Sequence, residues 1–559
     1  MTTTFNDEVL AQLAADIDAG LATEPTQFSG RGRALAKWRR NHQLRTQDTT
    51  DTVEPQWGVR PYTLSPRGYR GPGGGAMDTV LPPLEWQATT MHACGLSPWV
   101  VGAAAPLVGT PVGAHQATGE PACVDVLAWF AAGLIANPSA FVLSLPGLGK
   151  STLIRKMVLG AVAQGQVPII AGDMKPEYVA ITEAVGGQVI TLGHGRGTIN
   201  PLAAGSLGAT IPVLEAHRDQ LEANGQLSLI AETQELVHSR QVTMCAALIE
   251  LIRQATVADF EYALISAGLR ELRDGGKFSF ANPPLVRHLA DQITAGSPRL
   301  KRVAAADDDN EYAETVRPLR RSLEALLDGP LGAIFADHTS TTLDLDATAI
   351  CIDVSGLTRG DKKLKAAVML ACWSDAYGSM EAAHLLAAAG LAKQRYFLAV
   401  LDELWQVLGA GAGMVNRIDE LTRLNRTDGT GLLMITHTGR DLESLPSAID
   451  VQIAKGFIER SGMVITGGLP AGELKRLEDV LQFSSAEQEL ITSWSRGAPL
   501  RRQRRRARQK PMGIGKFMIK ISKDGAPGIP IQTLLTDTEQ ALALHDTNSR
   551  FADLIAQAT

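Results

Sequence analysis

The stretch that decides the fold is Ser144-Leu-Pro-Gly-Leu-Gly-Lys-Ser151. It follows an apolar run at residues 139–143 and precedes a helical pattern at residues 152–159. A strand, a loop ending in Gly-Lys-Ser and a helix indicate a P-loop, because this arrangement directs backbone N–H groups and a helix N-terminus at a phosphate. The stretch departs from the usual pattern at its first position, where Ser144 replaces glycine, and Pro146 removes one N–H donor.

The P-loop predicts ATP and Mg²⁺ as cofactors. Lys150 would reach the β- and γ-phosphates, and the Ser151 hydroxyl would hold Mg²⁺. The predicted nucleotide-binding residues of this segment are Ser144, Leu145, Pro146, Gly147, Leu148, Gly149, Lys150, Ser151 and Thr152.

A second motif, Phe397-Leu-Ala-Val-Leu-Asp-Glu403, has the Walker B pattern of an apolar strand that ends in two carboxylates. In an open α/β sheet, such a strand brings its last residues to the edge where ligands bind. Asp402 would hold Mg²⁺, and Glu403 would act as general base on the attacking water. Asp-Glu also suits the first turn of a helix, and residues 404–408 have a helical pattern, so both interpretations can hold together.

A third apolar run ends at Thr436 and His437. Thr436 would sense the γ-phosphate from the strand tip, or it simply closes the strand as β-branched residues often do. His437 is either a further contact in the catalytic site or a surface histidine.

Three more groups are candidates for the site. Arg423 and Arg426 end an amphipathic helix over residues 417–426, where they complement the helix dipole or one enters a neighbouring subunit as an arginine finger. Asp173, Lys175 and Glu177 follow another apolar run. They would contact the nucleotide or couple hydrolysis to movement, or they form an ordinary strand-to-helix turn.

Composition indicates a globular chain, with 559 residues of which 45% are hydrophobic and 20% charged. This length suffices for two or three domains. The net charge of −6 argues against general nucleic-acid binding by the whole chain. The densest basic run is Arg501–Lys510, which would bind DNA phosphates, contact anionic lipid or remain a solvated loop. Aromatic residues do not interleave with it, so base stacking is not indicated.

Five cysteines far apart in sequence form neither a zinc pattern nor a disulfide framework, and a reducing cytosol fits them. The N-terminus has no signal-peptide pattern. Residues 93–114 are uncharged but contain three prolines, so we expect loops and short strands and no integral membrane segment.

The pattern along the chain predicts an α/β fold with a central, mostly parallel sheet. Five regions are expected: a basic, Pro/Gly-rich region at 1–90, the first part of the ATPase domain with the P-loop at 91–204, an all-α insertion at 205–335, the second part at 336–535, and a C-terminal helix at 536–559. The expected strands are residues 139–143, 167–171, 187–191, 349–354, 397–401, 432–436, 451–454, 463–466 and 517–522.

Taken together, these segments resemble the type IV secretion, or conjugative transfer, ATPases of the TraC/TrbE or VirB-four type, in the HerA/FtsK group of RecA-like motors. The resemblance covers residues 95–540. Beyond the P-loop it includes four stretches: Val189-Ile-Thr-Leu-Gly193 with Ile199-Asn-Pro-Leu202, Asp402-Glu-Leu-Trp405, Gly515–Lys520 with Gly528-Ile-Pro530, and Thr118–Asp125. Three features depart from the family: about 140 residues precede the P-loop where a large N-terminal domain is usual, Ser144 replaces glycine, and His437 replaces glutamine.

The resemblance implies a RecA-like P-loop fold and a hexameric or dimeric cytoplasmic ATPase. Such an enzyme docks on membrane-channel components at the cytoplasmic face of the membrane and drives export, conjugation or pilus assembly. Two other functions remain open. One is a DNA-translocating motor of the coupling-protein or FtsK/HerA kind, which the basic run supports. The other is a nucleotide-binding scaffold with little turnover, against which an intact Glu403 argues.

Overall fold

The structure is a computed structural model that describes residues 7–19, 34–36, 38–39, 63–65, 68–70, 105–357, 361–410, 414–422, 429–445, 447–497, 511–521 and 525–545. The chain divides into two compact units, Met1–Gly95 and Leu96–Thr559. In the first, helix α1 (Asp7–Asp18) buries Leu10 and Ala14 in a small cluster with Leu35. Strands β1 (Thr63–Ser65) and β2 (Gly68–Arg70) pair antiparallel.

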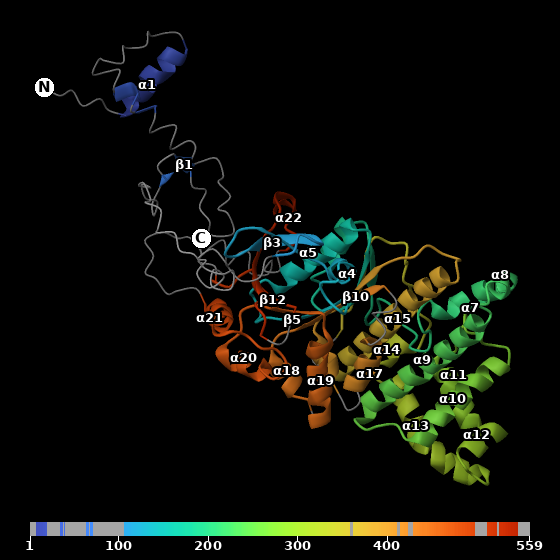
Figure 1. Cartoon of the computed structure of the whole chain (residues 1–559). Coiled ribbons are helices and arrows are strands. Elements are labelled where there is room, and N and C mark those ends of the chain that lie inside the picture. The colour runs from blue at the N-terminus through green and yellow to red at the C-terminus, as the bar shows by residue number, and fades with distance from the viewer. Residues whose placement is uncertain are drawn as a thin grey trace, which may run out of the picture. The chain divides into compact units, whose positions relative to one another are not determined.

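The second unit is built on an eleven-stranded sheet with the order β4-β3-β13-β12-β11-β5-β10-β9-β6-β8-β7 (Figure 1). The strands are β3 (Thr110–His115), β4 (Pro121–Val124), β5 (Ser139–Leu143), β6 (Val167–Asp173), β7 (Gln188–Thr191), β8 (Ile350–Asp353), β9 (Phe397–Leu401), β10 (Thr430–Thr436), β11 (Met463–Thr466), β12 (Lys516–Lys520) and β13 (Ile529–Thr533). The run from β11 to β7 is parallel, and β12, β13, β3 and β4 extend it antiparallel. The predicted mostly parallel sheet is confirmed.

Both faces of the parallel strands are covered, which explains why their sequences read as continuous apolar runs. In β5, Ala140 and Val142 belong to one core with α5 (Lys150–Ala163). Phe141 and Leu143 belong to the core that includes α15 (Lys362–Ala388). This alternation follows from the two-residue period of a strand and places α5 and α15 on opposite faces of the sheet.

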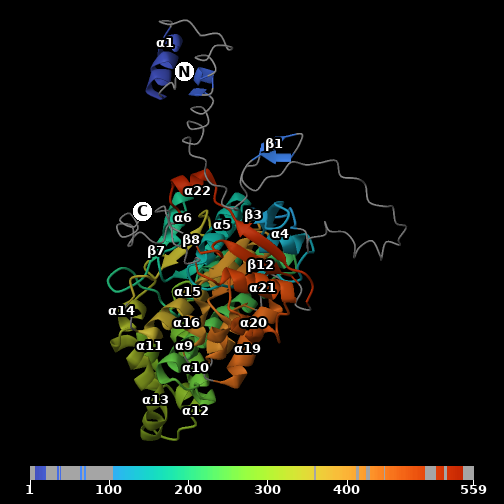
Figure 2. The same ribbon diagram turned by 90° about the vertical axis from the view of Figure 1, so that its left-hand side faces the viewer.

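Residues 205–335, all of which the structure describes, contain helices and no strand. They are α7 (Leu207–Ala216), α8 (Arg218–Ala223), α9 (Ser228–Arg253), α10 (Asp259–Asp274), α11 (Val286–Ala295), α12 (Pro298–Val303), α13 (Asp309–Asp328) and α14 (Gly332–Phe335). Figures 1 and 2 both show α9 to α13 grouped together, away from β3 and β12. Their apolar faces join the same core as α15, so this helical group extends the α15 side of the sheet.

The remaining helices cover the sheet or link its strands. They are α4 (Val126–Ala131), α6 (Val179–Ala184), α16 (Leu404–Leu408), α17 (Met414–Thr422), α18 (Gly439–Glu443), α19 (Ala448–Arg460), α20 (Ala471–Leu477), α21 (Ser485–Trp494) and α22 (Asp537–Ala541). Of the helix predicted at 536–559, residues 546–559 lie outside the described part of the chain.

The strand predicted at residues 451–454 is wrong, because these residues lie inside α19. The Ser447 hydroxyl accepts a hydrogen bond from the N–H of Ile449 and caps the helix. Ala454, Phe457 and Ile458 are buried at helical spacing. Four residues were too few to distinguish the two-residue period of a strand from the 3.6-residue period of a helix.

The C-terminal segment packs on the helix that follows the P-loop. Lys156 of α5 pairs with Glu539 of α22 at 2.8 Å, and both side chains are buried. Arg155 donates to the carbonyl oxygens of Ser151, at 3.1 Å, and Leu544, at 2.8 Å. These contacts hold the C-terminal segment against the first two turns of α5.

Candidate functional site

The P-loop connects the carboxyl end of β5 to α5. Gly147 and Gly149 have φ angles of 80° and 92°, in the left-handed region that glycine adopts without steric cost. Gly149 is the N-cap of α5, and no side chain caps this helix end. The partial positive charge of the helix N-terminus therefore faces a loop whose backbone fits an anion such as phosphate.

Ser144 occupies the position where the P-loop pattern has glycine. It is fully buried, has no positive φ, and its hydroxyl donates to the carbonyl oxygen of Leu145 at 3.2 Å. Gly467, just after β11, makes room for this side chain, because a Cβ at position 467 would lie 2.3 Å from the Ser144 Oγ. The serine in the P-loop and the glycine beside β11 are thus matched in size.

We expect Gly467→Ala to destabilise the protein by about 1–3 kcal/mol, the usual cost of adding a methyl group to a packed site. It should also weaken nucleotide binding, because the added methyl group displaces the first residue of the P-loop. Denaturant unfolding and nucleotide titration measure the two effects. The double variant Ser144→Gly with Gly467→Ala should recover most of both. If Gly467→Ala had the same effect in the wild-type protein and in Ser144→Gly, Gly467 would not be needed to make room for the Ser144 side chain.

Lys150, the P-loop lysine, is buried in the site with 8% of its surface exposed. Its ammonium group donates to the carbonyl oxygen of Thr436 at 3.1 Å and lies 2.8 Å from Nδ1 of His437. Burial lowers the pKa of Lys150, and the nearby carboxylates of Asp402 and Glu403 raise it in part. The lysine therefore already lies beside the end of β10 and the two acidic residues that end β9.

Asp402 follows the last residue of β9. One oxygen accepts a hydrogen bond from the Tyr178 hydroxyl at 3.0 Å, and the other accepts from the N–H of Glu403 at 2.8 Å. Burial raises the pKa of Asp402, while the Lys150 ammonium group lowers it in part. A divalent cation at this position would stabilise the charged carboxylate that burial disfavours.

Glu403 stands at a strained turn, with a φ angle of 53° in the left-handed region. Its carboxylate pairs with Lys175, accepts from the Trp405 indole N–H at 2.6 Å, and lies 3.2 Å from Nε2 of His437. Burial raises the pKa of this carboxyl, but the hydrogen bonds from His437 and Lys175 outweigh it and hold the pKa well below its usual range. Glu403 is therefore ionised at neutral pH.

Asp173 organises the turn after β6. Its two oxygens accept from the N–H groups of Lys175, at 3.1 Å, Glu177, at 3.1 Å, and Tyr178, at 2.7 Å. Burial raises the pKa of Asp173 to about 6, against the lowering effect of these hydrogen bonds. The turn places the Lys175 ammonium group against the Glu403 carboxylate and the Tyr178 hydroxyl against the Asp402 carboxylate. One buried oxygen of Glu177 has no hydrogen-bond partner.

Thr436 ends β10 between β5 and β9, so the three predicted motifs meet at neighbouring strand ends. Its hydroxyl donates to Asp441 at 3.3 Å, and its carbonyl oxygen accepts from Lys150. His437, the next residue, lies between Lys150 and Glu403. Arg423, Arg426 and the basic run Arg501–Lys510 lie outside the described residues, so their roles stay predictions.

The residues present fit Mg²⁺ with a nucleotide. Among the described residues, no three His, Cys, Asp or Glu side chains group as a metal site of their own. Mg²⁺ in nucleotide sites is usually held by one or two protein groups together with phosphates and water. Ser151 at the start of α5 and the half-buried Asp402 are suited to be those groups.

Comparison with known proteins gives a fold relationship. No protein-family model and no curated protein match the chain. Among solved structures, VirB4 of Thermoanaerobacter pseudethanolicus matches with a TM-score of 0.55 and 18% identity, over 79% of this chain and 100% of that chain. The chain has the VirB4 fold. The RecA-like fold that the motifs predicted is therefore confirmed.

The bacterial conjugative coupling protein TrwB also matches, with a TM-score of 0.42, 12% identity, and coverage of 78% of this chain and 96% of that chain. TrwB in complex with ADP and Mg²⁺ matches with a TM-score of 0.40, 13% identity, and coverage of 73% and 88%.

In this chain, three further side chains contact the predicted site residues, and the sequence motifs had not assigned them to the site. They are Tyr178, which contacts Asp402, Trp405, which contacts Glu403, and Asp441, which contacts Thr436. Trp405 belongs to a stretch that carries the resemblance, and Tyr178 directly follows the candidate Glu177, so both residue types were visible in the sequence. Their partners were not, because these contacts depend on how neighbouring strands align.

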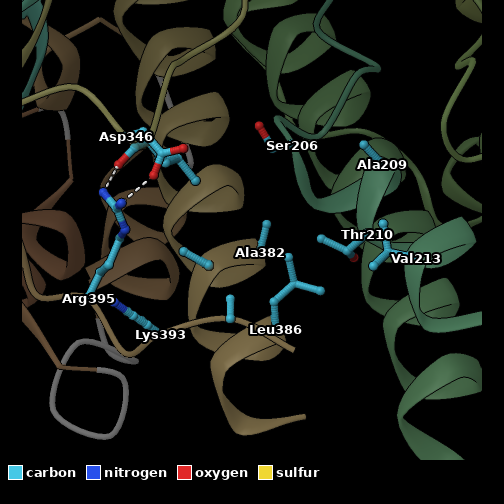
Figure 3. A pocket seen from close by; sticks show the side chains of 12 residues that line it. Ser206, Ala209, Thr210, Val213, Asp346, Ala382, Leu386, Lys393 and Arg395 are labelled. Atoms are coloured by element: carbon cyan, nitrogen blue, oxygen red, sulfur yellow. Dashed lines mark hydrogen bonds and ion pairs between the residues drawn. The ribbon is translucent and has the colours of Figure 1, made fainter. Parts of the chain in front are cut away.

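A pocket of about 410 Å³ lies elsewhere on the VirB4 fold, between α7 and α15 (Figure 3). Apolar side chains such as Val213 and Leu386 form one part of its lining. Arg395, paired with Asp346, lies at another part together with Lys393. It includes none of the predicted site residues, so its position does not bear on the nucleotide site.

Proposed function

We propose that this chain hydrolyses ATP and is the motor of a type IV secretion or conjugation system. The observation that carries the proposal is the meeting of three motifs at one edge of the sheet. The P-loop follows β5, Thr436 and His437 lie at the end of β10, and Asp402 and Glu403 directly follow β9. These three strands are neighbours in the sheet of a chain with the VirB4 fold.

Each residue of the site has a role that its surroundings support. The glycines of the P-loop and the N-terminus of α5 bind the phosphates, and Lys150 donates to them. Ser151 and Asp402 hold Mg²⁺, which neutralises phosphate charge when the nucleotide is bound. Glu403 accepts a proton from the attacking water, and its lowered pKa keeps it in the ionised form that this step needs.

The proposed setting is the cytoplasmic face of a membrane, where the chain assembles as a homo-oligomer, with a hexamer favoured, and docks on channel components. In the part of the chain that the structure describes, no helix is both long and apolar enough to cross a membrane. DNA contact through Arg501–Lys510 belongs to the alternative function of a DNA-translocating motor.

Steady-state phosphate release by the purified chain, with and without DNA and over a range of salt concentrations, tests the proposal. We expect Mg²⁺-dependent hydrolysis that DNA does not stimulate and that Lys150→Ala abolishes. Strong stimulation by DNA that falls steeply with salt would favour the translocating motor. Turnover equal to that of Lys150→Ala would overturn the ATPase and leave a nucleotide-binding scaffold.

A further inference from the structure

His437 lies between the two residues on which the proposed hydrolysis depends. Its Nδ1 is 2.8 Å from the Lys150 ammonium group, and its Nε2 is 3.2 Å from a carboxylate oxygen of Glu403. Lys150 comes from α5 and Glu403 from the turn after β9, so the imidazole ring connects two separate elements of the site. The side chain of His437 is largely enclosed, with 21% of its surface exposed.

The partners of the ring determine where its proton lies. A lysine ammonium group has three donors and no acceptor, so Nδ1 must accept the hydrogen bond from Lys150. An imidazole that accepts at Nδ1 is neutral and carries its hydrogen on Nε2. This N–H then points at Glu403, an ionised carboxylate that only accepts. Lys150 and Glu403 therefore require the same tautomer of His437, and the ring is held between them.

The other contacts of Glu403 complete the arrangement. Lys175 pairs with one carboxylate oxygen, while the Trp405 indole and His437 both donate to the other. In this state all three partners orient the proposed general base. The His437 contact alone is linked to the P-loop lysine, through the opposite nitrogen of the same ring.

We propose that His437 is a positioning residue that couples phosphate binding at Lys150 to the orientation of Glu403. The inference rests on the proposed function. A nucleotide phosphate competes with Nδ1 of His437 for the Lys150 ammonium group. When the phosphate takes this donor, the ring keeps its hydrogen on Nε2, because the ionised Glu403 carboxylate still requires a donor there, but it loses the contact that anchors Nδ1. The ring and the carboxylate can then turn together, and His437 goes on donating to Glu403 as Glu403 approaches a water molecule.

Nitrogen-15 NMR of the full chain with ¹⁵N-labelled histidine tests the coupling directly. The His437 signals are identified by their loss in His437→Gln. In the nucleotide-free protein at mildly alkaline pH, we expect a protonated Nε2 and an unprotonated Nδ1. In Lys150→Met, which removes the ammonium group but keeps the side-chain length, we expect the same tautomer, with the Nδ1 signal shifted to that of an imidazole nitrogen that accepts no hydrogen bond. A proton on Nδ1 in the wild-type protein, or identical spectra for Lys150→Met, would overturn the inference.

Addition of Mg²⁺ and a non-hydrolysable ATP analogue separates this inference from the proposed function. Calorimetric titration first measures whether the analogue binds. Binding that shifts the His437 signals toward those of Lys150→Met supports the coupling. Binding that leaves them unchanged overturns the coupling and leaves the ATPase proposal in place. Absence of binding counts against the ATPase itself, while the dependence of the nucleotide-free Nδ1 signal on Lys150 still tests the Lys150–His437 link.

Two substitutions at position 437 separate positioning from packing. Glutamine offers an acceptor and a donor on one side chain, so His437→Gln can keep both contacts and should retain clearly more of the wild-type kcat than a residue that makes neither contact. His437→Leu keeps volume but loses both contacts, and we expect a loss in kcat of up to about 10²-fold, the cost of a misplaced catalytic group. Equal losses in both variants, or none in His437→Leu, would contradict the positioning role.

Discussion

Replacing Glu403 with glutamine should reduce ATP hydrolysis by about 10²–10⁴-fold, the usual contribution of a general base, while nucleotide binding is retained. The amide has the size of the carboxylate and can still accept from Trp405, but it cannot take a proton from water. Phosphate release measures the first effect and calorimetric titration with ATP the second. Glu324→Gln, on the exposed face of α13, is a matched control that should hydrolyse at the wild-type rate.

The pattern of results distinguishes three outcomes. Loss of turnover with intact binding supports Glu403 as the base. Wild-type turnover in Glu403→Gln would show that another group accepts the proton. Equal, near-zero turnover in both proteins would favour the scaffold.

Asp375→Asn should remove a large pH dependence of stability. Asp375 is buried in α15 and accepts a hydrogen bond from the N–H of Gly205. Burial raises its pKa from 3.8 to about 7, although Arg240 nearby lowers it in part. Between these two pKa values the folded protein binds more protons than the unfolded chain, so the wild-type protein loses stability as pH rises from about 4 to about 7. The shift corresponds to at most about 4.5 kcal/mol, at about 1.4 kcal/mol per pKa unit.

Asparagine stays neutral and can accept the same hydrogen bond, so Asp375→Asn should lack this decline and be more stable than wild type above pH 7. Urea unfolding at about pH 5 and about pH 8 measures the effect. Asp291→Asn, at an exposed position of α11, should keep the wild-type pH profile. A wild-type profile in Asp375→Asn as well would show that other groups cause the pH dependence.

The parallel strands could be predicted because their information is local. Residues 140–143 and 397–401 are apolar throughout, as is typical of a strand covered on both faces, and the structure forms strands at residues 139–143 and 397–401. The P-loop was equally readable, since its glycines are needed for backbone angles that other residues rarely adopt. The strand prediction for residues 451–454 failed because a short alternating run does not show whether the flanking residues continue with a period of two residues, as in a strand, or of 3.6 residues, as in a helix.

By itself, the sequence predicted which residues would carry the chemistry, namely Lys150, Asp402 and Glu403, and which strands present them. Only the tertiary structure decided how they interact. His437 reaches Lys150 across 287 positions of sequence, and Gly467 makes room for Ser144 from the end of a neighbouring strand. Such contacts depend on strand order and register, which bring residues distant along the chain to one edge of the sheet, and no local pattern records them.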